Sequence, residues 1–260
     1  MKTDSIGFLG GGRIVRILLA AWQRSGRLPE KIIVSENDGA IRERLKAEFP
    51  SVEAVTDCTL VAGCDIVFMA LHPPAAKTVL PELKLSLNPK AVLVSLAPVL
   101  TSVKIGGMLG GFNRIARMIP NAPSIIGKGY NPVWYAPSLG KPECELLDGL
   151  FSPLGDTPVV SEDALEAYAI LSAMGPTYFW FQLFQLIELG QSFGLEREAA
   201  TEAVCRMICG AAGTIYKGKL SPEQILDLIP VNPLAEDEPA VKKIYQERLT
   251  ALYNKIKPAG

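Results

Sequence analysis

Ile6-Gly7-Phe8-Leu9-Gly10-Gly11-Gly12-Arg13-Ile14-Val15 is the most informative segment of the chain. Its first four residues have the apolar character of a buried strand, and a helical pattern begins directly after the glycines. Glycine at position 10 permits a tight turn, and glycine at position 12 lets backbone amides at a helix N-terminus approach a pyrophosphate. Val15 replaces the small third residue of the usual motif, so we expect the helix slightly farther from the strand. The segment predicts a dinucleotide-binding turn, with a tight turn that binds nothing as the alternative.

Short apolar runs alternate with helical stretches in the first part of the chain. Strands are expected at residues 5–9, 31–35, 65–70, 91–96 and 115–118, and helices at residues 13–25, 40–49 and 74–83. Such alternation is typical of βαβ units, and it predicts an α/β fold with a parallel sheet of the Rossmann type.

Strand-like runs disappear in the second part of the chain. Helical periodicity takes over after Ser161, so we expect a Rossmann dinucleotide-binding domain at residues 1–160 and an all-helical domain at residues 161–260. Pro176 follows Gly175 inside a long apolar stretch and is expected to break it into two helices, because proline cannot continue the hydrogen-bond ladder.

Composition and charge limit the classes of partner. The chain has 26 lysines and arginines against 27 aspartates and glutamates, so it has no basic excess for a nucleic acid. Hydrophobic residues make up 48% of the chain, and the mean hydropathy is +0.22. A buried interface between subunits is one place where so much apolar surface could be covered.

The cysteines are five in number and scattered, which indicates reduced thiols rather than a disulfide framework. Cys205 and Cys209 lie four residues apart on an expected helix and could share a metal ion. The chain has one histidine, His72, and no Cys-x-x-Cys pair, so we expect buried core thiols and no metal site.

The N-terminal residues lead directly into a strand and show no export signal. The apolar segment 178–189 carries Gln182, Gln185 and Glu188 at three-residue spacing, which predicts a helix with one polar stripe rather than a membrane span. A cytoplasmic location is therefore expected.

Glu36 closes the second expected strand, 24 residues after Gly12. An acid at this place would hydrogen-bond the adenosine ribose of NAD and repel the 2′-phosphate of NADP. Ser35 and Asn37 beside it, with arginines at positions 42 and 44, could instead accommodate a phosphate, and a merely exposed acid is a further alternative. The sequence leaves the choice between NAD and NADP open.

Several strings resemble motifs of the pyrroline-5-carboxylate reductase family. Ala70-Leu71-His72-Pro73 stands where the family has Ala-Val-Lys-Pro, and Arg117-Met118-Ile119-Pro120-Asn121-Ala122-Pro123 resembles its Arg-x-Met-Pro-Asn-Thr-Pro. Ser172-Ala173-Met174-Gly175-Pro176-Thr177-Tyr178 resembles Ser-Gly-Ser-Gly-Pro-Ala-Tyr, and the string Gly210-Ala211-Ala212 follows at the family's spacing. The resemblance runs from about Ile6 to Tyr216.

The resemblance implies a reductase of proline biosynthesis with a helical dimerisation domain of the 6-phosphogluconate dehydrogenase C-terminal type. A homodimer would form through this domain, and the active site would lie where the nicotinamide meets the partner's helices. Binding of a small-molecule substrate is implied as well.

The chain also departs from the family pattern. The Ser-Pro-Gly-Gly-Thr-Thr segment, which is expected to hold the substrate carboxylate, is absent, and Ile229-Pro230-Val231-Asn232-Pro233 stands about where it belongs. His72 replaces a lysine, Phe184 replaces a glutamate, and Ser95-Leu96-Ala97-Pro98-Val99 lacks a glycine. The residues thus differ where the family binds its amino-acid substrate, which indicates a related reductase with another substrate.

Candidate site residues follow from the turn, the strand ends and the resemblance. Cofactor contacts are expected from Gly10, Gly12, Arg13, Ile14, Ser35, Glu36, Asn37, Ala70, Leu71, His72, Pro73, Ala97 and Asn121. Catalytic or substrate contacts are expected from His72, Thr177 and Tyr178. The ordinary alternatives are a His-Pro loop residue, a turn-forming asparagine and a core tyrosine with a satisfied hydroxyl.

Three functions are compatible with these patterns. The first is an NAD(P)H-dependent reductase that transfers hydride to a cyclic imine or a related small carbonyl compound. The second is a dinucleotide-binding protein without turnover that serves regulation or sensing. The third, an oxidoreductase that exchanges hydride with a deazaflavin, is disfavoured by the strings between Ser172 and Gly213, which resemble the imine reductases.

Overall fold

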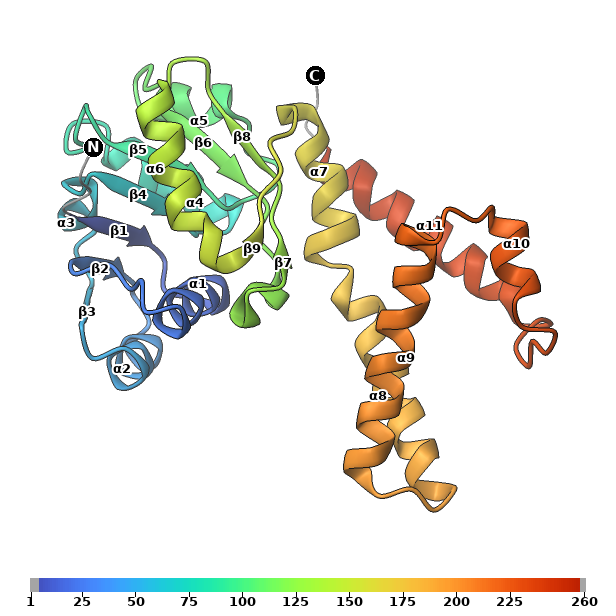
Figure 1. Ribbon diagram of the computed structural model, residues 1–260. Coiled ribbons are helices and arrows are strands. Elements are labelled where there is room, and N and C mark those ends of the chain that lie inside the picture. Colours follow the sequence, from blue (N-terminus) through green and yellow to red (C-terminus); the bar gives the residue numbers. More distant parts are fainter. Residues whose placement is uncertain (1–4, 258–260) are drawn as a thin grey trace. The chain divides into compact units, whose positions relative to one another are not determined.

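The computed structural model of the chain describes residues 5–257 (Figure 1). Of these residues, 5–174 and 253–257 form one compact unit, and Gly175–Leu252 forms the other. The two units divide after Met174, whereas the sequence predicts that the helical domain begins at residue 161. The segment after residue 160 stays with the first unit because Leu165 and Glu166 are buried in it and Glu166 is paired with Arg117.

A seven-stranded sheet forms the centre of the first unit. Its order is β3-β2-β1-β4-β5-β6-β8, with every pair parallel except the antiparallel pair β6–β8. The strands are β1 Ile6–Leu9, β2 Ile32–Ser35, β3 Val52–Val55, β4 Ile66–Met69, β5 Val92–Ser95, β6 Ile115–Met118 and β8 Val133–Tyr135. Two further strands, β7 Gly129–Tyr130 and β9 Gly155–Asp156, pair with each other. The parallel Rossmann-type sheet is confirmed.

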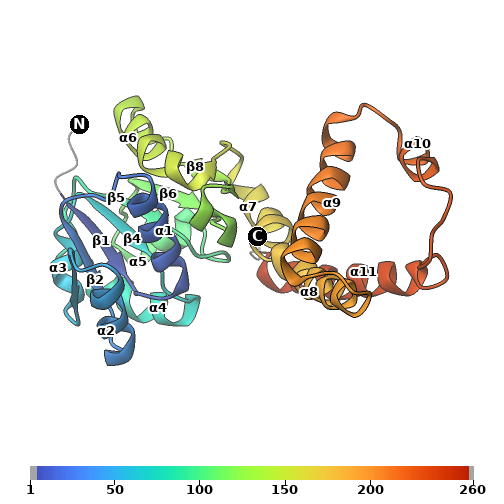
Figure 2. The ribbon, with the colours of Figure 1, turned by 60° about the horizontal axis from the view of Figure 1, so that its bottom comes forward.

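Helices cover both faces of this sheet (Figures 1 and 2). The helices of the first unit are α1 Arg13–Arg24, α2 Gly39–Glu48, α3 Cys58–Ala62, α4 Pro73–Glu82, α5 Ser102–Met108, α6 Lys141–Phe151 and α7 Leu165–Tyr168. Successive strand residues point to opposite faces, so β1 places Phe8 and Leu9 in two different hydrophobic clusters. Phe8 stacks on Phe68 with ring centroids 4.8 Å apart, and Trp22 of α1 packs edge-on against Phe68.

Shorter helical turns connect these elements. Ala122–Ile126, Ser152–Leu154 and Glu162–Ala164 are 3₁₀ helices, and Ala169–Ala173 is one turn of π-helix between α7 and the second unit. The expected break at Gly175-Pro176 is confirmed, because α8 begins at Pro176.

The second unit contains helices and no strand among its described residues, as the sequence predicts. Its helices are α8 Pro176–Ser192, α9 Arg197–Lys217, α10 Pro222–Asp227 and α11 Glu238–Ile256, of which the last residues belong to the first unit. Helices α8 and α9 lie side by side in Figure 1, and Gly190 allows the close approach, because a Cβ there would lie 3.0 Å from the Cβ of Ala200.

Much apolar surface of α8 and α9 is uncovered in the single chain. Helix α8 has no buried residue, and α9 has only Ala200. The prediction that Cys205 and Cys209 are core thiols is wrong for the single chain, because both are exposed on α9. Within residues 5–257, no helix is long and apolar enough to cross a membrane.

Candidate cofactor site

The turn after β1 needs glycine at position 10 for two reasons. Gly10 has a φ of +91°, a conformation that side-chain-bearing residues rarely adopt. A Cβ there would also meet the carbonyl oxygen of Ala70 at 3.0 Å and the Leu71 side chain at 3.1 Å. The Gly10 N–H donates to the Ser35 carbonyl oxygen at 2.8 Å, which joins the turn to the end of β2.

Gly12 leaves the N-terminus of α1 open. It is the N-cap residue with an ordinary φ of −69°, no side chain caps the helix, and a Cβ there would meet nothing within 4 Å. The first amides of a helix point outward and favour negative charge, so this end can hold a pyrophosphate. Arg13 and Ile14 are the first two residues of the helix, and Val15 is completely buried in the core.

Glu36 lies directly beside this turn. Its Oε2 accepts a hydrogen bond from the Gly11 N–H at 2.9 Å, and its Oε1 accepts one from the Asp38 N–H at 2.9 Å. A cavity of about 280 Å³ opens here, and Gly10, Ser35, Glu36, Asn37 and Leu71 are among its lining residues. The structure therefore brings together five of the residues that the sequence nominated, from β1, β2 and the segment after β4.

The segment after β4 lies next to the glycine turn. The Ala70 N–H donates to the Leu9 carbonyl oxygen at 2.9 Å, which continues the pairing of β1 with β4 beyond both strands. His72 is the N-cap residue of α4, is exposed, and does not cap the helix with its side chain, and Pro73 is the first helical residue. In the sheet order, β1 and β4 are neighbours at the point where the connections reverse, which is where ligands bind in such sheets.

A buried ion-pair cluster fixes the segment after β5, and sequence reasoning missed it. Arg117 of β6 is 1% exposed and donates to Glu166 at 2.7 Å and to Glu162 at 3.0 Å. The Glu166 Oε1 also accepts from the N–H of Val99, which has a φ of +78°. The one available signal was an arginine in an otherwise apolar strand, but its partners are more than forty residues away in sequence.

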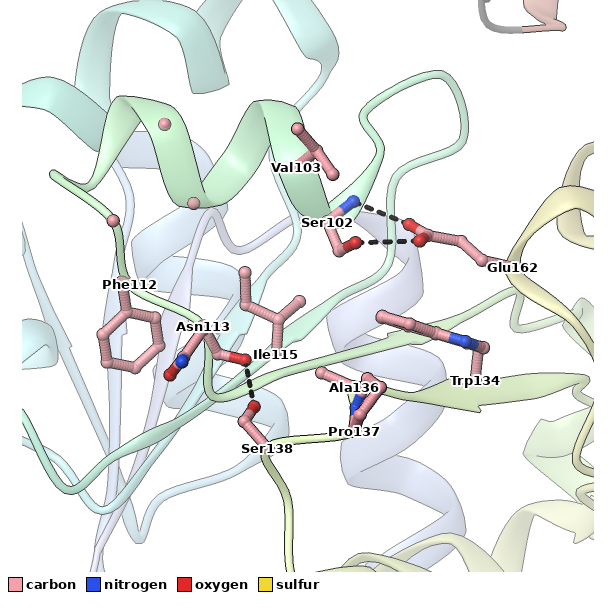
Figure 3. Close-up of a pocket in the computed structure, with 13 residues that line it drawn as sticks. Ser102, Val103, Phe112, Asn113, Ile115, Trp134, Ala136, Pro137, Ser138 and Glu162 are labelled. Atoms are coloured by element: carbon pink, nitrogen blue, oxygen red, sulfur yellow. Dashed lines mark hydrogen bonds between the residues drawn. The ribbon is translucent and has the colours of Figure 1, made fainter.

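Glu162 extends this cluster to α5, as Figure 3 shows. Its two carboxylate oxygens accept from the backbone N–H of Ser102 at 2.6 Å and from the Ser102 hydroxyl at 2.8 Å. Trp134 and Phe112 face the adjoining cavity of about 620 Å³, beside α5, β6 and β8. Strands β6 and β8 end the sheet opposite to β2 and β3, so this cavity is separate from the glycine turn. Ala97, just after β5, is buried.

Asn121 has its polar atoms engaged by the protein itself. It is 6% exposed, its Oδ1 accepts from the Tyr130 N–H at 3.2 Å, and its Nδ2 donates to the Ser172 carbonyl oxygen at 3.3 Å. These bonds give Asn121 a structural role in the turn, which is the ordinary alternative for this residue. Its contact with a cofactor stays a prediction.

Thr177 and Tyr178 belong to the second unit. They line an apolar cavity of about 300 Å³ between α8 and α11 with Phe181, Tyr245 and Arg248. The Tyr178 and Tyr245 rings meet edge to face at 6.0 Å. Burial, and to a lesser extent Tyr245, raises the pKa of the Tyr178 phenol, so the hydroxyl stays protonated and able to donate. Their contact with a substrate stays a prediction.

Metal-binding residues do not gather anywhere in the described part of the chain, where no group of three His, Cys, Asp or Glu side chains could hold an ion.

Comparison with known proteins finds relatives that align with nearly the whole length of this chain. Residues 5–98 match a family described as NADP oxidoreductase, coenzyme F420-dependent. The chain is 24% identical over 253 residues to a pyrroline-5-carboxylate reductase of Pseudomonas aeruginosa, covering 97% of this chain and 92% of that protein. It is 25% identical over 228 residues to the enzyme of the same name from Pisum sativum, covering 86% and 81%.

Solved structures of proteins with this name share the fold. A pyrroline-5-carboxylate reductase from Coxiella burnetii is 28% identical, with a TM-score of 0.71 over 98% of this chain and 95% of that one. The Plasmodium falciparum pyrroline carboxylate reductase with NADP bound has a TM-score of 0.82 at 22% identity, over 99% and 98% of the two chains.

Proposed function

Since the chain belongs to the pyrroline-5-carboxylate reductase family, we propose that it transfers hydride from NADH or NADPH to the C=N bond of a small cyclic imine, or to a related small carbonyl compound. The observation that carries this proposal is the glycine turn between β1 and α1, with Gly10 in a conformation that glycine favours and Gly12 facing open space. The match to a coenzyme F420-dependent family covers only residues 5–98, whereas the imine reductases align along nearly the whole chain, which favours the imine.

In this proposal, the first unit binds the cofactor. The outward amides of α1 hold the pyrophosphate, and the Glu36 carboxylate holds the adenosine ribose. Leu71, His72 and Pro73 follow β4 at the same sheet edge and would line the path toward the nicotinamide, which supplies the hydride when bound. His72 would donate a proton where the substrate is a ketone, whereas an iminium needs no such donor.

The segment between α10 and α11 bears on the choice of substrate. Residues 229–233 lie between α10 and α11, with Ile229 and Val231 each at least 70% exposed. This segment has two prolines, which lack an N–H, and it has no hydroxyl side chain. Its one side-chain N–H donor, the amide of Asn232, bonds the Glu238 carboxylate of the chain itself. We therefore propose that carboxylate-free imines are better substrates.

The proposed active enzyme is a homodimer. Phe181, Phe184 and Phe193 of the second unit are each more than 60% exposed in the single chain. Large exposed apolar patches mark interaction sites, and a second copy of the same helices would bury them by twofold symmetry. A subunit interface would also account for the exposed Cys205 and Cys209 on α9.

An initial-rate assay tests the proposal. Oxidation of NADH and NADPH by the purified protein is followed with pyrroline-5-carboxylate and, in parallel, with cyclic imines of the same ring size that lack the carboxylate. We expect turnover, with the higher kcat/KM for the carboxylate-free imines. A clear preference for pyrroline-5-carboxylate would overturn the substrate assignment, and cofactor binding without any turnover would favour a binding role instead.

A further inference from the structure

We propose that the protein selects NAD(H) over NADP(H), and that Glu36 is the residue that makes this selection. The inference rests on the proposed function, because it concerns the cofactor of the same site. Resemblance to the family does not by itself decide between the two dinucleotides.

Glu36 is held where an adenosine ribose would lie. It follows the last residue of β2, and the register pairs Ser35 with Leu9, so Glu36 stands opposite the first glycine of the turn. The hydrogen bond from the Gly11 N–H to the Glu36 carboxylate holds this side chain against the glycine turn that follows β1. A second bond from the Asp38 N–H fixes the other oxygen, so the carboxylate has one defined orientation.

The fixed carboxylate still has capacity for a ribose. An ionised carboxylate offers about four acceptor positions, and the two backbone amides occupy two of them. The remaining positions suit the 2′- and 3′-hydroxyl groups of NAD, which are donors. The 2′-phosphate of NADP is an anion with acceptor oxygens and would meet a like charge at this place.

The lining of the cavity beside Glu36 holds a second carboxylate. Glu82 of α4 lines the same cavity, and no lysine or arginine does so among the described residues. Burial raises the pKa of the Cys58 thiol in the same lining, and the carboxylates of Asp57 and Glu82 raise it further. A phosphate would therefore enter a cavity that is unfavourable to anions.

The two arginines of α2 already make bonds within the protein. The Arg42 Nη1 donates to the carbonyl oxygens of Glu36 and Asn37, each at 2.8 Å, so the guanidinium braces the backbone after β2. The Arg44 side chain pairs with Glu48 at 2.9 Å. The two arginines that could have accommodated a phosphate are therefore already bonded to protein groups, Arg42 through Nη1 and Arg44 through Nε.

Calorimetric titration of the full-length protein with NADH and with NADPH tests the inference. We expect NADH to bind at least about tenfold more tightly, the scale of a charge-assisted hydrogen bond. Glu36→Gln keeps an acceptor oxygen for the Gly11 amide but removes the charge, and we expect it to reduce the NADH/NADPH affinity ratio at least about tenfold. Asn37→Arg in the same background should improve NADPH binding further.

Glu53→Gln is the matched control, since Glu53 is an exposed glutamate on β3, away from the cavity, and the charge change is the same. We expect it to leave the affinity ratio unchanged. Equal or tighter binding of NADPH by the wild-type protein would overturn the inference and leave the proposed function intact. If neither dinucleotide bound, the proposed function would fail and the inference with it.

Discussion

At the scale of single residues, the two outer glycines of the turn serve different physical purposes. Gly10 is required by its φ of +91° and by the nearby Ala70 carbonyl, both of which are properties of the folded protein itself. Gly12 has an ordinary backbone conformation and open space around it, so the fold does not require glycine there. A requirement for glycine at position 12 would come from the ligand.

Substitution by alanine separates these purposes. We expect Gly10→Ala to lower the free energy of unfolding by about 1–3 kcal/mol, because its backbone is strained for any side chain. We expect Gly12→Ala to change stability by less than about 0.5 kcal/mol but to weaken NADH and NADPH binding about tenfold or more, because its methyl group occupies the approach to the helix amides. Urea denaturation and calorimetric titration measure the two quantities.

Gly26→Ala is the control for backbone strain alone, since Gly26 has a φ of +67° and nothing within 4 Å of a built Cβ. It should cost roughly 1–2 kcal/mol and leave cofactor binding unchanged. Unaltered cofactor affinity in Gly12→Ala would contradict the assignment of this turn as the pyrophosphate site.

At the scale of elements, the local sequence pattern was enough to predict the strands and the turn that form the candidate cofactor site. Apolar runs and glycine spacing depend on neighbouring residues, and they predicted β1, β2, β4, β5 and β6 with the helix after the turn. Strand β3 was not predicted, because Glu53 interrupts its apolar character.

The cluster around Arg117 could not be predicted in the same way. Its ion pairs join β6 to Glu162 and Glu166, which lie 45 and 49 residues farther along the chain. Such partners are brought together only by the fold. For the same reason, the sequence alone does not show that the segment from Glu162 to Met174 clusters with the first unit.

Arg117→Met tests how much this cluster contributes. The substitution leaves the Glu166 carboxylate buried without its cation, and we expect the free energy of unfolding to fall by about 3–5 kcal/mol. Arg206→Met is the control, because Arg206 pairs with Glu202 on the exposed surface of α9 and should cost less than about 1 kcal/mol. Equal losses in urea denaturation would show that burial does not strengthen the Arg117 pairs.

At the scale of the whole molecule, the proposed active enzyme contains a second copy of the chain. The protomer has a mass of 28.0 kDa, and we expect light scattering after size exclusion to give about twice that value. Phe184→Glu places a charge in the apolar surface of α8 and should shift the protein toward the monomer, because an unpaired charge is costly to bury.

Leu85→Glu provides the control for that substitution, since Leu85 is a 94% exposed leucine of the first unit. We expect it to leave the mass unchanged. A Phe184→Glu protein that keeps the wild-type mass would place the subunit interface elsewhere.

Isotope transfer tests hydride transfer most directly. The protein is incubated with a cyclic imine and NADH or NADPH deuterated at the reactive carbon, each face of the ring in turn, and the amine product is analysed by mass spectrometry. We predict one deuterium in the product from one face and none from the other, because a bound cofactor presents a single face to the substrate. Product without deuterium from either face, or no product while the dinucleotide binds, would contradict this prediction.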